Sequence, residues 1–439
     1  MKNIVVSVGL VAIGATGLQV ASAQDIGAPD KSKPWSVSAT LRGFYDDNIN
    51  SAPSNANLGG ASRDSFGVEV SPSAMVGIDT GPTTASLGYT FSAKWYENRP
   101  AYNADNWDLT HDFNAALTHA FNERYNVSVH DSFVIGQEPD FLRAGNSYST
   151  FQRIPGDNIR NLGSINFGAE LTRQVGLELG YSNAFYDYAD NTTYIQVQPV
   201  GPPLVAPSRS AVLDRMEQTF HLDGRWHLQP QTTAILGYQY AQTDYLADQI
   251  VYFDPSGNAQ FSDVRNSRSH YGYVGADHNF RADLSASARV GVRYTDYFND
   301  PSGDTDLGPF ARLSMRYHYL PDSYVEGGFN YDLSATDLLG FNGESFTRSA
   351  ETANLFASLH HQITPKLIGT VTGQFQNSTY NGGSFDSETE QFFLAGLNLE
   401  YRFNRHFAAD VGYNYDKLMS DIGRGFDRNR VYIGLTASY

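Results

Sequence analysis

The sequence contains no cysteine in its 439 residues. Disulfide bonds, thiolate metal sites and a lipid-modified cysteine at an export-cleavage site are therefore excluded. Basic residues are also few, with 30 Lys and Arg against 47 Asp and Glu and a formal net charge of −17. Nucleic-acid binding needs a basic surface, so this acidic balance predicts no nucleic-acid partner.

Long apolar runs are missing too, apart from one at the N-terminus. Lys2 carries a positive charge, residues 4–20 are mostly apolar or small, and an Ala-x-Ala motif ends at Ala23. This order is typical of a secretory signal peptide, and we expect cleavage after Ala23. An N-terminal membrane anchor is less favoured, because the run is short and broken by glycine. We expect a short segment at 24–34 and a single domain at 35–439.

What the chain does contain is a long series of alternating apolar and polar residues, with 13% aromatic residues. Alternation indicates β-strands, because successive side chains of a strand point to opposite faces. The pattern predicts about eighteen strands (16–20), with boundaries less certain than their existence. The predicted strands are 35–45, 65–79, 84–96, 107–121, 125–137, 158–172, 174–188, 214–228, 231–246, 267–280, 284–298, 307–320, 323–335, 347–362, 366–380, 387–403, 406–418 and 428–439.

Short and long connections alternate along this series. Short ones, such as Gln229–Pro230 and Asn404–Arg405, follow every second strand, and the others are longer. A transmembrane antiparallel up-and-down β-barrel has this pattern, with tight periplasmic turns, longer outer loops and lipid covering its apolar face. The alternative is a soluble all-β sandwich or propeller, but strands of soluble proteins average about 5–6 residues. We therefore predict an all-β outer-membrane barrel with both ends of the domain in the periplasm.

Charged residues on the face opposite the apolar stripe are candidates for the lining of a water-filled bore, because an unpaired charge is costly in a dry interior. Arginines lie four residues apart on each of two successive strands. One interpretation is a basic strip that attracts anionic or hydroxyl-rich solutes. The other is that the arginines pair with acidic residues and brace the wall. The candidate lining residues are Arg289, Arg293, Arg312, Arg316, His318, Glu326, Asp332, Glu400 and Arg402.

Some residues do not fit the pattern of an apolar outer face and a charged inner face. Asp131 and Asp277 fall on the predicted apolar face, which indicates a shift of register, a bulge or a position at the water boundary. Asp300, Asp304 and Asp306 have oxygen ligands at a spacing that suits Ca²⁺, but a solvated acidic turn is the favoured interpretation. The proline-rich residues 197–207 cannot extend a sheet, so they either fold inward as a constriction or extend outside. We expect no other metal site and no cofactor.

The last residues form the clearest strand of the sequence. Apolar or aromatic side chains occupy every second position, namely Val431, Ile433, Leu435, Ala437 and Tyr439. A strand that ends the chain on an aromatic residue resembles the closing strand of bacterial outer-membrane barrels. The resemblance implies that the barrel assembly machinery recognises this strand.

The opening strand ends in Phe44-Tyr45-Asp46-Asp47-Asn48-Ile49-Asn50. This entry, the hairpins that follow and the aromatic terminus resemble the family named putative β-barrel porin 2, several members of which accompany exopolysaccharide systems. The resemblance implies an outer-membrane channel that passes saccharides, exopolysaccharide or small polar solutes. The alternatives are a non-conducting barrel whose acidic loops bind cations, lipopolysaccharide or a partner, and a membrane-embedded hydrolase. No nucleophile elbow or phosphate-binding loop is present, so we predict that the chain is not an enzyme.

Overall fold

The structure is a computed structural model that describes residues 33–57, 62–98, 106–137, 147–151, 157–199, 201, 203–300 and 303–439. The predicted signal peptide and most of the segment 24–34 lie outside the described residues. In the part of the chain that is described, no helix is long and apolar enough to cross a membrane.

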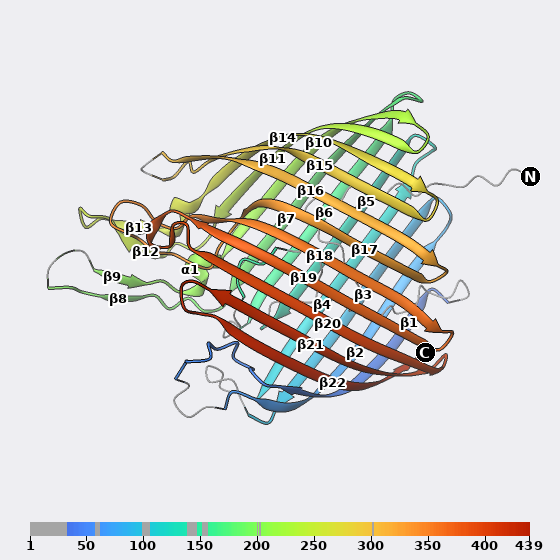
Figure 1. The fold of residues 1–439 in the computed structure, drawn as a ribbon, viewed down its shortest axis with the longest axis horizontal. Helices are drawn as coiled ribbons and strands as arrows, with labels where there is room; N and C mark the ends of the chain where they lie inside the picture. Colours follow the sequence, from blue (N-terminus) through green and yellow to red (C-terminus); the bar gives the residue numbers. More distant parts are fainter. Residues whose placement is uncertain are drawn as a thin grey trace, which may run out of the picture.

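Eighteen strands of the described residues form one closed antiparallel sheet (Figure 1). Each strand pairs with the next along the chain, and β1 pairs with β22 to close the barrel. The strands are β1 (Trp35–Asp46), β2 (Ser65–Asp79), β3 (Thr83–Tyr96), β4 (Trp107–Ala120), β5 (Tyr125–Gly136), β6 (Asn158–Glu170), β7 (Val175–Tyr188), β10 (Arg215–Gln229), β11 (Thr232–Tyr245), β14 (Ser267–Arg281), β15 (Leu284–Asp296), β16 (Thr305–Leu320), β17 (Ser323–Ser334), β18 (Ser349–Thr364), β19 (Leu367–Asn381), β20 (Thr389–Asn404), β21 (Phe407–Ser420) and β22 (Phe426–Ser438).

The prediction of an all-β barrel with eighteen strands is confirmed, and every predicted strand end lies within two residues of the observed one. Tight turns join the strands at one end of the barrel, which we call the short-turn end. Two of these turns contain residues with positive φ, Gly81 at +88° and Asp322 at +56°. Glycine and aspartate tolerate this conformation, so the sequence supports the tight reversal. Trp35 and Tyr439 also lie at the short-turn end, where the backbones of Val37 and Tyr439 are hydrogen-bonded.

The barrel is apolar outside and polar inside. On the outer face Leu236 and Ile433 are 69% and 67% exposed, whereas the inward Arg293 and Arg428 are almost fully buried. This inversion is what a bilayer environment requires, because lipid covers the outer face and water or ion pairs satisfy the inner one. The alternating residues of the closing strand, Val431, Ile433, Leu435, Ala437 and Tyr439, face outward with the rest of the apolar surface.

Of the three explanations offered for Asp277, the shift of register is the one that holds. On β14 the even-numbered residues face outward, and the Asp277 carboxylate lies inside, 2.9 Å from Nη1 of Arg289. Tyr271 and Tyr273 caused the error, because they suggest an apolar face but point inward, where their hydroxyls donate to Asp332 and Asp223. Asp131, in contrast, does lie on the outer face at mid-strand.

Longer connections pack together at the opposite end of the barrel, which we call the long-loop end. They contain the hairpin of β8 (Tyr194–Gln196) and β9 (Leu204–Ala206), the helix α1 (Arg209–Leu213), the hairpin of β12 (Ile250–Phe253) and β13 (Ala259–Phe261), and the short helices Ser262–Arg265 and Gly383–Phe385. In Figure 1 the hairpin of β8 and β9 projects away from the barrel. The described part of the proline-rich segment therefore extends outside and does not constrict the bore.

Candidate functional site: the bore and the segment that crosses it

A short stretch of the connection between β5 and β6, residues 147–151, lies inside the barrel. Its backbone binds β19, which stands on the opposite side of the closed sheet. The Tyr148 N–H donates to Oε1 of Gln376 at 2.8 Å, and Nε2 of Gln376 donates to the Tyr148 carbonyl at 2.9 Å. We call residues 147–151 the crossing segment, because they belong to the connection between β5 and β6 but contact β19 to β22 on the opposite side of the barrel.

Apolar contacts hold the crossing segment against the far wall. Tyr148 and Phe151 are buried with Phe392, Leu394, Leu418 and Phe426, which come from β20, β21 and β22. The Phe151 and Phe392 rings are stacked with centroids 5.0 Å apart. Two further hydrogen bonds fix Ser149, whose carbonyl accepts from the Asp337 N–H at 3.0 Å and whose hydroxyl accepts from Arg215 at 3.3 Å. The bore is therefore narrowed at this level.

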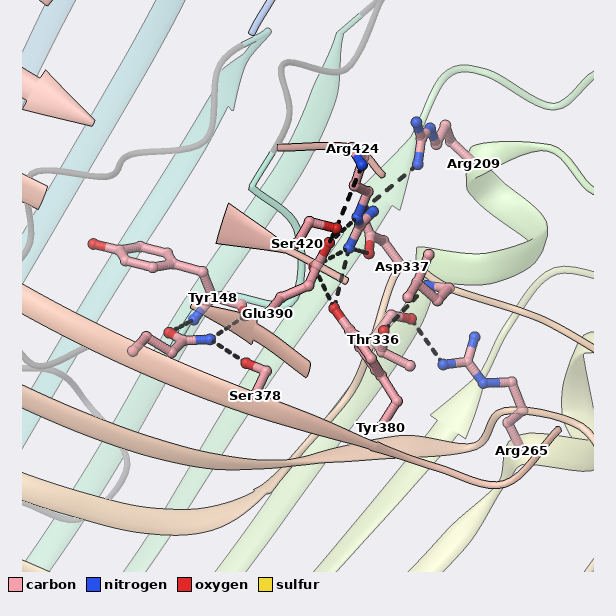
Figure 2. A network of polar contacts seen from close by, with 12 residues as sticks. Tyr148, Arg209, Arg265, Thr336, Asp337, Ser378, Tyr380, Glu390, Ser420 and Arg424 are labelled. Atoms are coloured by element: carbon pink, nitrogen blue, oxygen red, sulfur yellow. Dashed lines mark hydrogen bonds and ion pairs between the residues drawn. The ribbon is translucent and has the colours of Figure 1, made fainter. Parts of the chain in front are cut away.

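Arg424, in the turn between β21 and β22, clamps the loops above the crossing segment (Figure 2). Its guanidinium binds both oxygens of Asp337 at 2.8 and 2.9 Å and both oxygens of Glu390 at 2.6 Å, and it also contacts the Tyr380 hydroxyl. Burial alone would raise the pKa of Asp337, but the charge of Arg424 outweighs burial and holds that pKa below its ordinary value. The Arg424 pKa lies well above its ordinary value for the reciprocal reason, since Asp337 and Glu390 outweigh the effect of burial.

Arg265 organises a second part of the long-loop end. It is fully buried and donates to the carbonyl oxygens of Val212, Thr336 and Arg348, and its guanidinium lies over the Tyr245 ring. Burial lowers the pKa of this guanidinium. One side chain thereby joins α1, the strand β11 and the loop between β17 and β18. Figure 2 shows Arg265 pointing toward Thr336, next to the clamp.

Below these contacts the bore contains a cavity of about 590 Å³. Its wall combines many hydroxyl and amide groups with an excess of basic side chains, eight against four acidic ones, although the whole chain is acidic. The basic residues are Lys94, Arg160, Arg215, Arg265, Arg289, Arg312, Arg348 and Arg430, and the acidic ones are Asp112, Glu217, Asp223 and Asp332.

Several of these arginines have partners that do not line the cavity. Arg289 binds Asp277, Arg348 binds Asp300 and Asp304, and Arg430 binds Asp416, and none of these carboxylates lines the cavity. Basic groups therefore outnumber acidic ones in the cavity lining, while Asp277 and Asp416 lie elsewhere on the inner face of the barrel.

All nine residues predicted to line the bore lie on its inner face. Arg289, Arg312 and Asp332 line the cavity. Arg293 is fully buried among Asp306, Asp332 and Glu351, and Arg316 binds Glu326 at 2.6 Å. These two arginines brace the wall, as the alternative interpretation proposed. The remaining three lie near the short-turn end, with His318 beside the Tyr324 ring and Arg402 binding Glu400 at 2.6 Å.

The three aspartates with calcium-like spacing are engaged by arginines. Asp300 and Asp304 both bind Arg348, at 2.7 and 2.5 Å, and Asp306 binds Arg293. Within the described ranges, no group of three His, Cys, Asp or Glu side chains is arranged to hold a metal ion. The geometry here is that of ion pairs, and it does not support the calcium interpretation.

Sequence reasoning missed the residues that build the crossing segment and the clamp. Tyr148 and Phe151 are aromatic residues in a predicted outer loop, which was an available signal that this loop packs against something. Gln376 and Arg424 carried no signal, because their partners are Tyr148, Asp337 and Glu390, all far away in the sequence.

Comparison with known proteins agrees with the barrel. Residues 349–439, which contain β18 to β22, match the family described as Putative beta-barrel porin 2. No curated protein matches the chain. Similar solved structures include OccAB4 of Acinetobacter baumannii, with 12% identity over 93% of this chain and 99% of that one and a TM-score of 0.41. The outer membrane protein OpdK of Pseudomonas aeruginosa has 11% identity over 92% and 99%, with a TM-score of 0.42. A mutant ferric enterobactin receptor, PfeA, of the same organism has 10% identity over 94% and 81%, with a TM-score of 0.42.

The family match covers the last five strands, and the closed sheet extends the same architecture to the rest of the barrel. The family is described as a porin family, in agreement with the prediction that the chain is not an enzyme. The chain is a porin-like outer-membrane β-barrel that resembles the Putative beta-barrel porin 2 family.

Proposed function

We propose that the barrel is a channel for small anionic, hydroxyl-rich solutes such as acidic saccharides. The observation that carries the proposal is the excess of basic groups on the cavity wall in a chain with a net charge of −17. A cavity whose wall carries an excess of one sign of charge raises the local concentration of the opposite ion. The surrounding serine, threonine, asparagine and glutamine side chains supply hydrogen bonds that sugar hydroxyls can use.

The placement of Arg289 and Arg312 supports this role. The two are directly opposite each other on β15 and β16. Like charges directly opposite destabilise a sheet, so bracing alone gives no reason to place them there. Arg289 forms an ion pair with Asp277, and Arg312 forms one with Asp332. Both arginines line the cavity. A carboxylate solute would meet two fork-shaped donors at this level.

The test is ion selectivity in planar bilayers. Under a salt gradient, the purified barrel should give a reversal potential that reports preference for chloride, and acidic monosaccharides should block that current more strongly than neutral ones. Removing one guanidinium about 8 Å from the permeating ion changes its energy by roughly 1 kcal/mol at an effective dielectric constant of about 40, or about fivefold in selectivity. Arg312→Ala should show this loss, whereas Arg316→Ala, which removes a bracing residue, should not. Preference for cations in the wild-type protein would refute the proposal.

A non-conducting interaction barrel is the second candidate, and the crossing segment together with the Arg424 clamp favours it. The same recordings separate the two functions. A channel gives stable conductance steps, and a closed interaction barrel gives none while remaining folded. We also propose that the N-terminal signal directs export and that the assembly machinery recognises the closing strand. An association with exopolysaccharide synthesis is part of the same proposal.

A further inference from the structure

The outer face of the barrel carries a carboxylate in the middle of its apolar belt. Asp131 is paired with Ala115 on β4 and Gly163 on β6. The same face of these and the next strand includes Phe113, Ile165 and Leu179, which are 40%, 44% and 50% exposed. Asp131 therefore lies among lipid-facing side chains.

The depth of Asp131 in the barrel wall is unusual for a charged residue. In each of the nine barrel strands that start at the short-turn end, the seventh residue points outward at a comparable depth. Only one of these nine residues is charged. They are Leu41, Tyr89, Asp131, Tyr181, Tyr238, Val290, Phe329, Gly373 and Tyr413. A carboxylate at this depth is costly in contact with hydrocarbon and usually indicates a functional contact.

Other polar groups gather beside it. Asn161 on β6 donates to Asp131 at 3.0 Å, and Asn183 on β7 is the outward neighbour of Gly163. Within the described residues the Asn183 side chain makes no hydrogen bond. Ala115 and Gly163 give the patch little bulk at its centre, and small residues next to polar ones are typical of protein–protein contacts inside membranes. We call Ala115, Asp131, Asn161, Gly163 and Asn183 the β5–β7 patch.

We propose that the β5–β7 patch is the contact surface for a second copy of this chain, related by a two-fold axis along the membrane normal that passes near Gly163. Such an axis keeps residues at their depth and places β5 of one copy opposite β7 of the other. Tyr181 is the seventh residue of β7, as Asp131 is of β5, so the two have matching depths. The Tyr181 hydroxyl and the Asn183 amide of each copy would donate to Asp131 of the other.

The absence of cysteine from the chain makes disulfide cross-linking unambiguous. Ile165 lies on β6 beside the proposed axis. Leu397 lies on β20, on the outer face at the opposite side of the barrel, and both residues are 44% exposed. With an oxidant in native membranes, Ile165→Cys should form a covalent dimer and Leu397→Cys should not. Combining Ile165→Cys with Asp131→Leu should reduce the dimer about tenfold. A second disrupting variant, Tyr181→Phe with Asn183→Ala, should act in the same direction.

Folding of each variant is checked by its heat-modifiable migration in gels, so loss of the dimer is distinguished from loss of the barrel. The proposal is overturned if Ile165→Cys and Leu397→Cys cross-link equally, or if the dimer persists with Asp131→Leu. It is also overturned if the folded Ile165→Cys protein stays monomeric in native membranes or cross-links to a different protein. The proposal does not depend on what the bore transports.

Discussion

Replacing Gln376 by leucine tests whether the crossing segment controls the width of the bore. The Gln376 amide pairs with both the N–H and the C=O of Tyr148, and these groups are buried. Leucine has a similar size but offers neither donor nor acceptor. Leaving a buried backbone group unpaired costs about 1–3 kcal/mol, so losing both partners costs roughly 2–6 kcal/mol.

Contacts that remain include the ring contacts of Tyr148 and Phe151 with Phe392 and the hydrogen bonds of Ser149 to Asp337 and Arg215. They keep the segment near the wall, but the Tyr148 N–H and C=O lose the Gln376 amide. Since about 1.4 kcal/mol corresponds to a factor of ten, a loss of about 2 kcal/mol raises the population of the unseated segment roughly 30-fold. We expect larger single-channel conductance with more frequent transitions, together with faster hydrogen exchange at the Tyr148 amide.

Gln239→Leu is the matched control. Gln239 is also a buried glutamine on the cavity wall, 4% exposed on β11, and it has no hydrogen bond to the crossing segment. If Gln376→Leu and Gln239→Leu have the same conductance, noise and exchange rates, the crossing segment does not determine the width of the bore.

Arg424, Asp337 and Asp214, at the long-loop end, give further predictions. Arg424→Ala removes the closest cationic partner of the buried Asp337 and Glu390, which keep Arg209 at 3.9 Å and the hydroxyls of Tyr380 and Ser420 respectively. It should destabilise the long-loop end by up to about 3–5 kcal/mol, measured by hydrogen exchange, with Arg281→Ala as an exposed control. The folded pKa of Asp337 lies below its ordinary value of 3.8, so the stability that Asp337 contributes is present above that pH and is lost as the pH falls below it. Burial raises the pKa of Asp214 to about 7, so protonated Asp214 contributes stability that is complete below pH 3.8 and lost as the pH rises through about 7. After correction for the intrinsic rise of exchange with pH, the protection of α1 should therefore fall between pH 3.8 and about 7 in the wild-type protein, and this fall should be absent from Asp214→Asn. An unchanged pH dependence of protection in that variant would contradict the assignment.

The strands could be predicted from the sequence because they depend on local information. A run such as Leu284 to Val292 alternates regularly, and a sheet with lipid outside must place every second residue on the same face. Two of the tight turns are also local in this sense, since they contain Gly81 and Asp322, which adopt positive φ. Strand number, order and closure all follow once these short hairpins are recognised.

The error at Asp277 has a physical cause that concerns tyrosine. A tyrosine has a large apolar ring and a polar hydroxyl, so it suits both an outer face covered by lipid and an inner face rich in carboxylates. Tyr271 and Tyr273 face inward because Asp332 and Asp223 accept their hydroxyls, and those partners lie on other strands. The alternation of residues shows that a strand has two different faces. Where one face carries tyrosines and the other carries small residues, the alternation does not show which face is the outer one.

The sequence does not show which of the inward-facing arginines line the cavity. Arg289, Arg293, Arg312 and Arg316 have the same residue type, spacing and face, and all four form ion pairs, yet only Arg289 and Arg312 line the cavity. Glu326 lies directly opposite Arg316, whereas the direct neighbour of Arg289 on β16 is another arginine. Arg293 has Tyr271 and Gly308 directly opposite, and its acidic partners lie at other positions of the register. Which arginines line the cavity therefore depends on the register between strands and on contacts beyond direct neighbours, and the type and spacing of the arginines alone do not show either.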